Sequence, residues 1–445
     1  MLAAFRNIFK IPDLRKKLLI TAGFLILYRV GRYIPLPGIN KTKLAELTHT
    51  GGGLADVLNQ ISMLTGGSLS QCTLFALGIM PYISASIIFS LLVKVVPALE
   101  ALQKEGESGR QKINQYTRYS TIGLCLIQGL FIVMWIKQNQ LAYSDDFGFW
   151  LLAILSLTTG TIFLMWIGEQ ITEFGIGNGI SLIIMAGIVA ALPGALFQFG
   201  KNITDAYDLG ENVSLEVLKL LVFIALFVGV VVAVVIMHLG QRRIPVQQQK
   251  HTRGRKIYGG QRHYLPIRIN SAGVMPVIFA DSLIILPTAL FSQLWPRLSD
   301  YLSRGDSFWY FFLYILMVIF FTYFWVSLTF NPVEMAGQMK EYGSFVPGIR
   351  PGRKTAEYLE TIMNRITFVG ALFLCFIGLF PTIVSSALNI NLLLARFLGG
   401  TGLLIVVGVS LDVVQKVESH LLMRHYEGFM KTGRMRGRRG GVGGI

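Results

Sequence analysis

The stretch FALGIMPYISASII, residues 75–88, decides how the rest of the chain is interpreted. It is apolar enough to lie in a lipid bilayer, yet it contains a proline, two serines and several isoleucines. A helix that faces only lipid has no need of that mixture. In membrane helices, small residues and hydroxyls serve close packing, hydrogen bonds between helices, or a water-filled cavity. The stretch therefore indicates a membrane helix that also faces protein or a cavity.

The composition of the whole chain agrees with a membrane protein. Of its 445 residues, 53% are hydrophobic and 14% are charged, and the mean hydropathy is +0.57. Soluble domains contain about 25% charged residues. The apolar runs approach the length of about 20 residues that a transmembrane helix needs, and they are far longer than the strands of a membrane barrel. We therefore expect an integral membrane protein built from helices.

The apolar runs predict an all-α polytopic fold with ten transmembrane helices. The first half, residues 18–196, and the second half, residues 217–414, each hold five spans and are joined by an external connection at residues 197–216. An odd number of spans per half means that the halves have opposite orientations, as in an inverted repeat with a cavity at its interface. The spans lie near Leu18–Ile34, Thr73–Val95, Tyr119–Ile136, Phe149–Ile167, Ile180–Leu196, Val217–Leu239, Ala272–Phe291, Trp309–Phe330, Ile366–Val384 and Phe397–Val414.

The basic residues predict the orientation of the chain. The N-terminal segment 1–17, the connections after spans two, six and eight, and the tail 415–445 hold 30 of the 40 Lys and Arg residues when Lys94 at the end of span two is included. Excess positive charge marks the cytoplasmic side of a membrane protein. Both termini are therefore expected in the cytoplasm, as an even number of spans requires.

Two of the cytoplasmic connections are longer than a helix hairpin needs. The loop at 240–271 carries eight basic residues and no acidic one, and the loop at 331–365 gathers its basic residues near residues 348–354. Such clusters satisfy the charge rule and attract anionic membrane lipid, but they also bind polyanionic or protein partners. Charge alone leaves these alternatives open.

Motifs of soluble enzymes and of metal sites are absent from the sequence. There is no HExxH, GxSxG or Walker A motif, and Cys72, Cys125 and Cys375 lack metal-ligand spacing. We therefore expect no catalytic activity, no cofactor and no metal. A secondary transporter of small solutes is the alternative, but it would place ionisable groups at the membrane midplane, where Asp281 is the clearest candidate.

Six segments resemble, in order and spacing, the signature sequences of the SecY family, the central pore subunit of the Sec protein translocase. They are FALGIMPYISASII, KEGESGRQKINQYTRY, MWIGEQITEFGIGNGIS, GQRRIPVQ, SAGVMPVIFA and FVPGIRPGRKTAEYL. The resemblance runs from about Leu14 to Tyr426 and implies a protein-conducting channel with an hourglass-shaped pore. In this family, isoleucines from several helices form a ring at the waist of the pore. By motif, the resemblance places this ring at Ile79, Ile83, Ile180, Ile184, Ile278 and Ile405. Two of the pairs are spaced i, i+4, which puts each pair on one helix face.

The resemblance also assigns a plug and a lateral gate. The plug is the glycine-bracketed segment at about 54–64, which would fill the external funnel of the resting channel, and spans two and seven would form the sides of the gate. The plug residues are Leu54, Ala55, Asp56, Val57, Leu58, Asn59, Gln60, Ile61, Ser62, Met63 and Leu64. The gate residues are Ser84, Ser86, Ser90, Gln128, Asn270 and Asp281.

The family further implies partners and a location. These are the subunits SecE and SecG, the SecA motor ATPase, the ribosome, signal sequences and unfolded precursors, at the inner membrane of a bacterium. Docking of the ribosome and SecA would use Arg255, Lys256, Arg350, Arg353 and Lys354. Three positions depart from the family pattern: Lys256 stands in place of an arginine, His238 in place of an acid, and Asp281 in place of a small residue.

Overall fold

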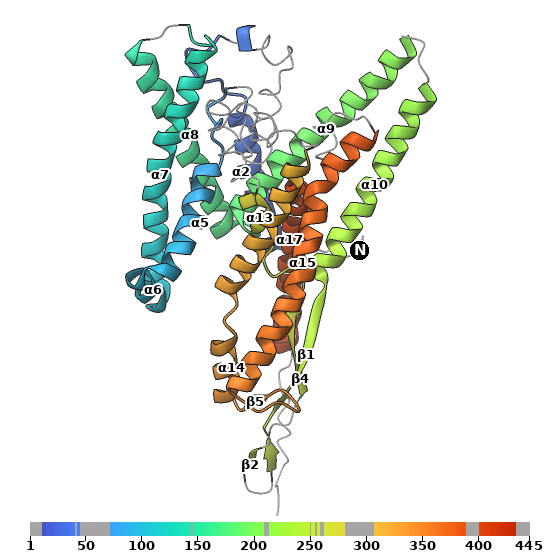
Figure 1. Ribbon diagram of the computed structural model, residues 1–445. Coiled ribbons are helices and arrows are strands. Elements are labelled where there is room, and N and C mark those ends of the chain that lie inside the picture. Colours follow the sequence, from blue (N-terminus) through green and yellow to red (C-terminus); the bar gives the residue numbers. More distant parts are fainter. Residues whose placement is uncertain are drawn as a thin grey trace, which may run out of the picture.

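The computed structural model describes residues 11–40, 42–44, 72–143, 146–208, 213–249, 251–253, 256–258, 262–280, 307–388 and 400–432. The chain is mostly helical, as predicted (Figure 1). The helices are α2 Pro12–Gly31, α5 Met80–Val95, α6 Pro97–Lys104, α7 Glu107–Gln138, α8 Phe147–Phe174, α9 Gly179–Asp208, α10 Val213–Leu239, α13 Phe308–Thr329, α14 Pro332–Glu341, α15 Arg353–Leu388 and α17 Gly400–Thr432. The strands are β1 Gln241–Gln248, β2 His251–Arg253, β3 Lys256–Tyr258, β4 Arg262–Arg268 and β5 Ser344–Phe345.

Among the described residues, five helical segments are long and apolar enough to cross a membrane. They are Glu107–Gln138, Phe147–Phe174, Val217–Leu239, Phe308–Glu341 and Arg353–Ala387, and α5 with α6 makes a sixth if that bent pair is one span. Every predicted span overlaps helical residues, although span seven is described only as far as the helical residues 275–280. The total of ten crossings stays a prediction.

The break between α5 and α6 follows from one proline. Val96 adopts an extended conformation (φ −97°, ψ 110°), as expected of a residue that precedes proline, and its N–H still bonds the carbonyl of Leu92. Pro97 then starts α6, where its missing N–H costs nothing. The two helices meet at an angle of 97°, so α6 runs across the end of α5 instead of extending it.

Close helix packing in the first half depends on glycine. A Cβ at Gly160 of α8 would lie 2.2 Å from the carbonyl oxygen of Leu74, and one at Gly31 would collide with the ring of Phe75. Phe75 itself stacks on Tyr28 with a centroid distance of 6.4 Å. Small residues therefore let α2, α8 and the segment before α5 approach more closely than larger side chains allow.

The second half has its own core, formed by α10, α13, α15, α17 and residues 275–280. Val318 and Leu374 are fully buried there, beside Val234 and Leu404. Figure 1 shows this group of helices apart from α5, α7 and α8, with α9 extending toward α17. The described residues thus form two bundles, which meet where α9 packs against α17.

The loop at 240–271, for which the sequence predicted no strand, forms β-structure within the mostly helical chain. β1 pairs with β4 along its length and with β5 at Gln247 and Gln248, which gives an antiparallel sheet of order β4-β1-β5. Alternation explains the strand, because Ile244 and Val246 are buried while Arg243 and Pro245 are exposed. Ile244 packs in a core with Leu359 and Ile362 of α15. Pro245 fits because only β4 pairs with β1 at that position, so its missing N–H can face the open edge. β2 and β3 form a second, two-stranded sheet.

Candidate functional site

Five of the six predicted isoleucines belong to one apolar cluster. Ile184 of α9 and Ile405 of α17 are buried in it, and Ile83 of α5, Ile180 of α9 and Ile278 pack against it. The remaining members are Ile188, Val274, Val406 and Val409. Residues from both halves build this cluster, and every member is apolar, so the cluster itself offers no charge that would bind a small polar solute.

Ile79 lies beside this cluster and not in it. Its side chain is 1% exposed and packs in the first-half core with Leu164 and Ile183, a core that Ile83 and Ile180 also contact. The i, i+4 relation to Ile83 exists at the backbone, where the Ile83 N–H bonds the Ile79 carbonyl oxygen at 3.0 Å. Ile79 is the N-cap residue of α5.

Ile188 is a member that sequence reasoning missed. It is 5% exposed and follows Ile180 and Ile184 at the same helical spacing. A search for i, i+4, i+8 isoleucines on one face would have found it.

A hydrogen-bonded turn sets the position of α9. The Asn178 side chain accepts hydrogen bonds from the backbone N–H groups of Ile180 and Ser181 at 3.1 and 3.3 Å, which caps the helix. The N–H of Gly179 bonds Thr172 Oγ1 of α8 at 2.9 Å. Because a Cβ at Gly179 would lie 2.0 Å from the Gly168 carbonyl oxygen, the close approach requires glycine. The turn therefore fixes where Ile180 and Ile184 enter the cluster.

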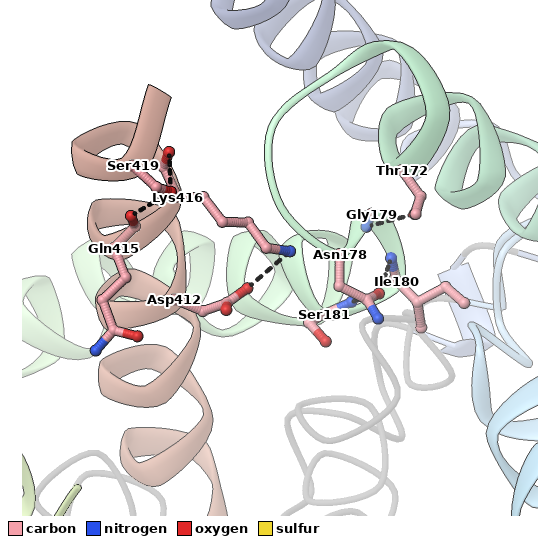
Figure 2. Close-up of polar contacts among 9 residues, drawn as sticks. All are labelled: Thr172, Asn178, Gly179, Ile180, Ser181, Asp412, Gln415, Lys416 and Ser419. Atoms are coloured by element: carbon pink, nitrogen blue, oxygen red, sulfur yellow. Dashed lines mark hydrogen bonds and ion pairs between the residues drawn. The ribbon is translucent and has the colours of Figure 1, made fainter. Parts of the chain in front are cut away.

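This turn faces the middle of α17. Figure 2 shows Lys416 extending from α17 toward Asn178, while its ammonium pairs with Asp412 at 3.2 Å. In the first half, Arg118 of α7 pairs with Glu169 of α8 at 2.8 Å. Both ion pairs are partly exposed, and none of the four residues belongs to the apolar cluster.

A cavity of about 520 Å³ separates α5, α6 and α7 from α13. Two predicted gate residues, Ser86 and Ser90, line it, and Trp325, Leu328 and Thr329 of α13 line it from the second half. The cavity wall from the second half therefore comes from predicted span eight. The sequence had not indicated these residues of α13 as part of the gate.

The other predicted gate residues do not line this cavity. Ser84 and Gln128 are half-buried elsewhere on α5 and α7. Asn270 follows β4, and its side-chain oxygen is buried without a hydrogen-bond partner in the described part of the chain. Asp281 lies outside the described residues, as does the whole plug segment 54–64.

The predicted docking residues divide into two groups. Arg350 is exposed in the turn before α15 and forms no ion pair with any residue that the structure describes, while its carbonyl oxygen accepts a hydrogen bond from Thr355 Oγ1 at 3.0 Å. Arg353 and Lys354 share Glu357, at 3.2 and 2.9 Å. Lys256 starts β3, and Arg255 lies outside the described residues. Among the docking candidates whose side chains the structure describes, Arg350 is thus the one that forms no ion pair with a described residue.

Known proteins resemble the chain over nearly its whole length. The sequence model of the SecY family matches residues 73–414. The chain is 40% identical over 446 residues to the protein translocase subunit SecY of Thermotoga maritima, which covers 99% of this chain and 100% of the relative. It is 43% identical over 437 residues to the subunit of the same name from Escherichia coli K12, which covers 96% of each chain.

Solved structures share the fold. One described as the structure of a protein conducting channel superimposes with a TM-score of 0.64 at 20% identity, and covers 95% of each chain. Sec61 from the canine ribosome-channel complex superimposes with a TM-score of 0.60 at 18% identity, with the same coverage. The fold is therefore that of the membrane channel proteins in this group. The chain itself belongs to the SecY family.

Proposed function

We propose that the chain forms the pore of a protein translocase, which moves unfolded secretory polypeptides across the membrane and releases membrane helices sideways into lipid. One observation carries the proposal: an uncharged cluster of isoleucines and valines joins the two halves of a chain whose relatives are named translocase subunits. Such a contact suits a seal that closes around a chain of any sequence, because it contains no group that would bind a particular one.

The six isoleucines, Ile79 included, are proposed to form the ring at the waist of an hourglass pore between inverted halves of five helices. A narrow apolar constriction loses its water, so ions face a barrier without a charged filter. The apolar cluster that contains Ile184 and Ile405, called the common cluster below, supports this assignment because five of the six isoleucines belong to it. Ile79 packs in the neighbouring core, which Ile83 and Ile180 also contact.

The gate is proposed to have α5 and α7 on one side and α13 and span seven on the other. Segment 54–64 is proposed as the plug. The cavity lined by Ser86, Ser90 and Thr329 supports the gate, because it separates helices of the two halves. Because the cavity interrupts the contact between these helices, separating them costs less free energy than separating helices across a continuous core.

The proposed assembly lies in the inner membrane of a bacterium, with both termini in the cytoplasm. SecE and SecG would accompany the chain, and SecA or the ribosome would dock on the basic loops and supply the energy. The pore itself needs no catalytic group and no cofactor for this function. The alternative, a secondary transporter of small solutes, is disfavoured because the relatives are named translocase subunits and the common cluster is uncharged.

The docking assignment predicts the effect of reversing one charge. We expect Arg350→Glu to weaken ribosome binding at low salt by at least about fivefold and to reduce its salt dependence, since a phosphate contact is lost. Lys340→Glu, the same charge change on the exposed surface of α14, is the control and should bind nearly as the unmodified chain does. Equal losses for the two variants would contradict a specific role of Arg350.

Reconstitution tests the function itself. The chain is placed in vesicles with candidate SecE, SecA is added, and ATP-dependent protection of a precursor from protease is measured. We expect protection that disappears without ATP. If the vesicles instead take up amino acids or ions whether or not the precursor is present, and the precursor is not protected from protease, the small-solute transporter would be supported.

A further inference from the structure

The cavity between the halves carries an unusual set of side chains. Its 13 lining residues include two cations, Lys94 and Arg110, and no carboxylate. Its neutral polar members are Ser86, Ser90, Gln103, Asn114, Thr117 and Thr329, and its apolar members are Phe89, Val93, Ile113, Trp325 and Leu328. A site with this lining suits a ligand that combines negative charge with apolar chains.

The two cations are available to such a ligand. Neither forms an ion pair with any residue in the described ranges, whereas nearby Lys104 pairs with Glu100 at 2.8 Å. The pKa of Glu100 is lowered, chiefly by that hydrogen bond and to a lesser degree by Lys94. Glu100 does not line the cavity. Lys94 and Arg110 therefore give the cavity itself a net positive character.

Three of the four hydroxyl groups in the lining already donate hydrogen bonds to backbone carbonyls. Ser90 donates to the Ser86 carbonyl at 2.7 Å, Thr117 to the Ile113 carbonyl at 3.0 Å, and Thr329 to the Trp325 carbonyl at 3.0 Å. The other donor groups of the lining are the two cations, the Gln103 and Asn114 amides, the Ser86 hydroxyl and the Trp325 indole N–H, a set that suits phosphate oxygens.

The cavity lies where a membrane span ends. Lys94 stands in the last turn of α5, directly before the 97° turn into α6, and Arg110 stands near the start of α7. Trp325 lines the wall near the end of α13, and tryptophan is enriched at the level of lipid headgroups. Headgroups and the first part of their acyl chains occupy this depth.

We propose that this cavity binds an anionic phospholipid of the cytoplasmic leaflet, with its phosphate at Lys94 and Arg110 and its acyl chains against Phe89, Trp325 and Leu328. The site rests on the proposed function, because its walls are the two sides of the proposed gate. A lipid that contacts both α5 and α13 binds with an affinity that depends on their separation, so its occupancy and the opening of the gate are coupled. Its charge also offsets a positive surface that would repel the basic start of a signal sequence.

Fluorescence of Trp325 tests the site. The full chain, with Trp325 retained and the other five tryptophans replaced by phenylalanine, is placed in bilayers that contain brominated phosphatidylglycerol or brominated phosphatidylcholine, which quench tryptophan on contact. We expect brominated phosphatidylglycerol to reach the same quenching at a mole fraction about twentyfold lower than brominated phosphatidylcholine. Each cation near the membrane surface raises the affinity for an anionic lipid about fivefold. Native mass spectrometry of the chain with all its tryptophans should show retained phosphatidylglycerol in the same preference.

Charge variants identify the residues responsible. Lys94→Gln with Arg110→Gln should abolish the preference, and Lys94→Arg with Arg110→Lys should keep it. The matched control is Lys104→Gln with Lys112→Gln, which removes the same charge from residues that pair with Glu100 and Glu105 outside the cavity, and it should also keep the preference.

Three outcomes would overturn the proposal. The first is equal quenching by the two lipids, and the second is a preference that survives in the double glutamine variant. The third is loss of the preference on adding inorganic phosphate, which would assign the cavity to a free anion. These measurements involve no transport, so a failure here leaves the translocation assay as a separate test.

Discussion

Replacing Ile184, Ile278 and Ile405 with serine will make the resting channel leak ions. These residues come from α9, the segment 275–280 and α17, and they meet in one cluster in which Ile184 is 7% and Ile405 5% exposed. Three hydroxyls would let water fill a constriction that is otherwise dry, and water carries ions with it. We expect the conductance of planar bilayers to rise at least about tenfold, which corresponds to a barrier lower by about 1.4 kcal/mol.

Ile377→Ser is the matched control for the leak. Ile377 is fully buried in the core of the second half, away from the common cluster. Its replacement should lower the thermal unfolding temperature, because it buries a hydroxyl and loses apolar contacts, but it should leave the conductance unchanged. Unchanged conductance of the triple variant, or an equal leak in the control, would count against the ring.

The sequence predicted the helices better than it predicted the loops, for a physical reason. Long apolar runs force helices in lipid, because every backbone group must be satisfied within the segment, and helical residues were found at every predicted span. The segment QRRIPVQQ has too few apolar residues and a central proline, so it gave no strand signal. Its pairing with β4 and β5 depends on partners that are distant in sequence.

The candidate site shows the same division. The resemblance to a family named the isoleucines, and the packing of Ile83, Ile180, Ile184, Ile278 and Ile405 together agrees with that set. Ile79 packs in the neighbouring first-half core, which Ile83 and Ile180 also contact, so its place in the ring stays a prediction. The wall that α13 contributes to the cavity could not be predicted, since only tertiary packing brings Thr329 opposite Ser90.

A gate between the halves makes a second strong prediction. Ser90 of α5 and Thr329 of α13 line the same cavity from different halves, while Ser90 and Asn114 line it from the same half. The three native cysteines are buried, so a bifunctional maleimide will react mainly with cysteines introduced at these exposed or lining positions.

Cross-linking Ser90→Cys to Thr329→Cys will abolish protein export, because it prevents the separation of α5 from α13 that a passing helix requires. We expect ATP-dependent protection of a precursor to fall to background, and a cleavable cross-linker should restore it on cleavage. The pair Ser90→Cys and Asn114→Cys accepts the same reagent at the same cavity but joins α5 to α7 within one half. That control should retain most of its export, since the halves stay free to part. Full export through the first cross-link would mean that these helices do not separate, and the gate would have to lie elsewhere in the chain.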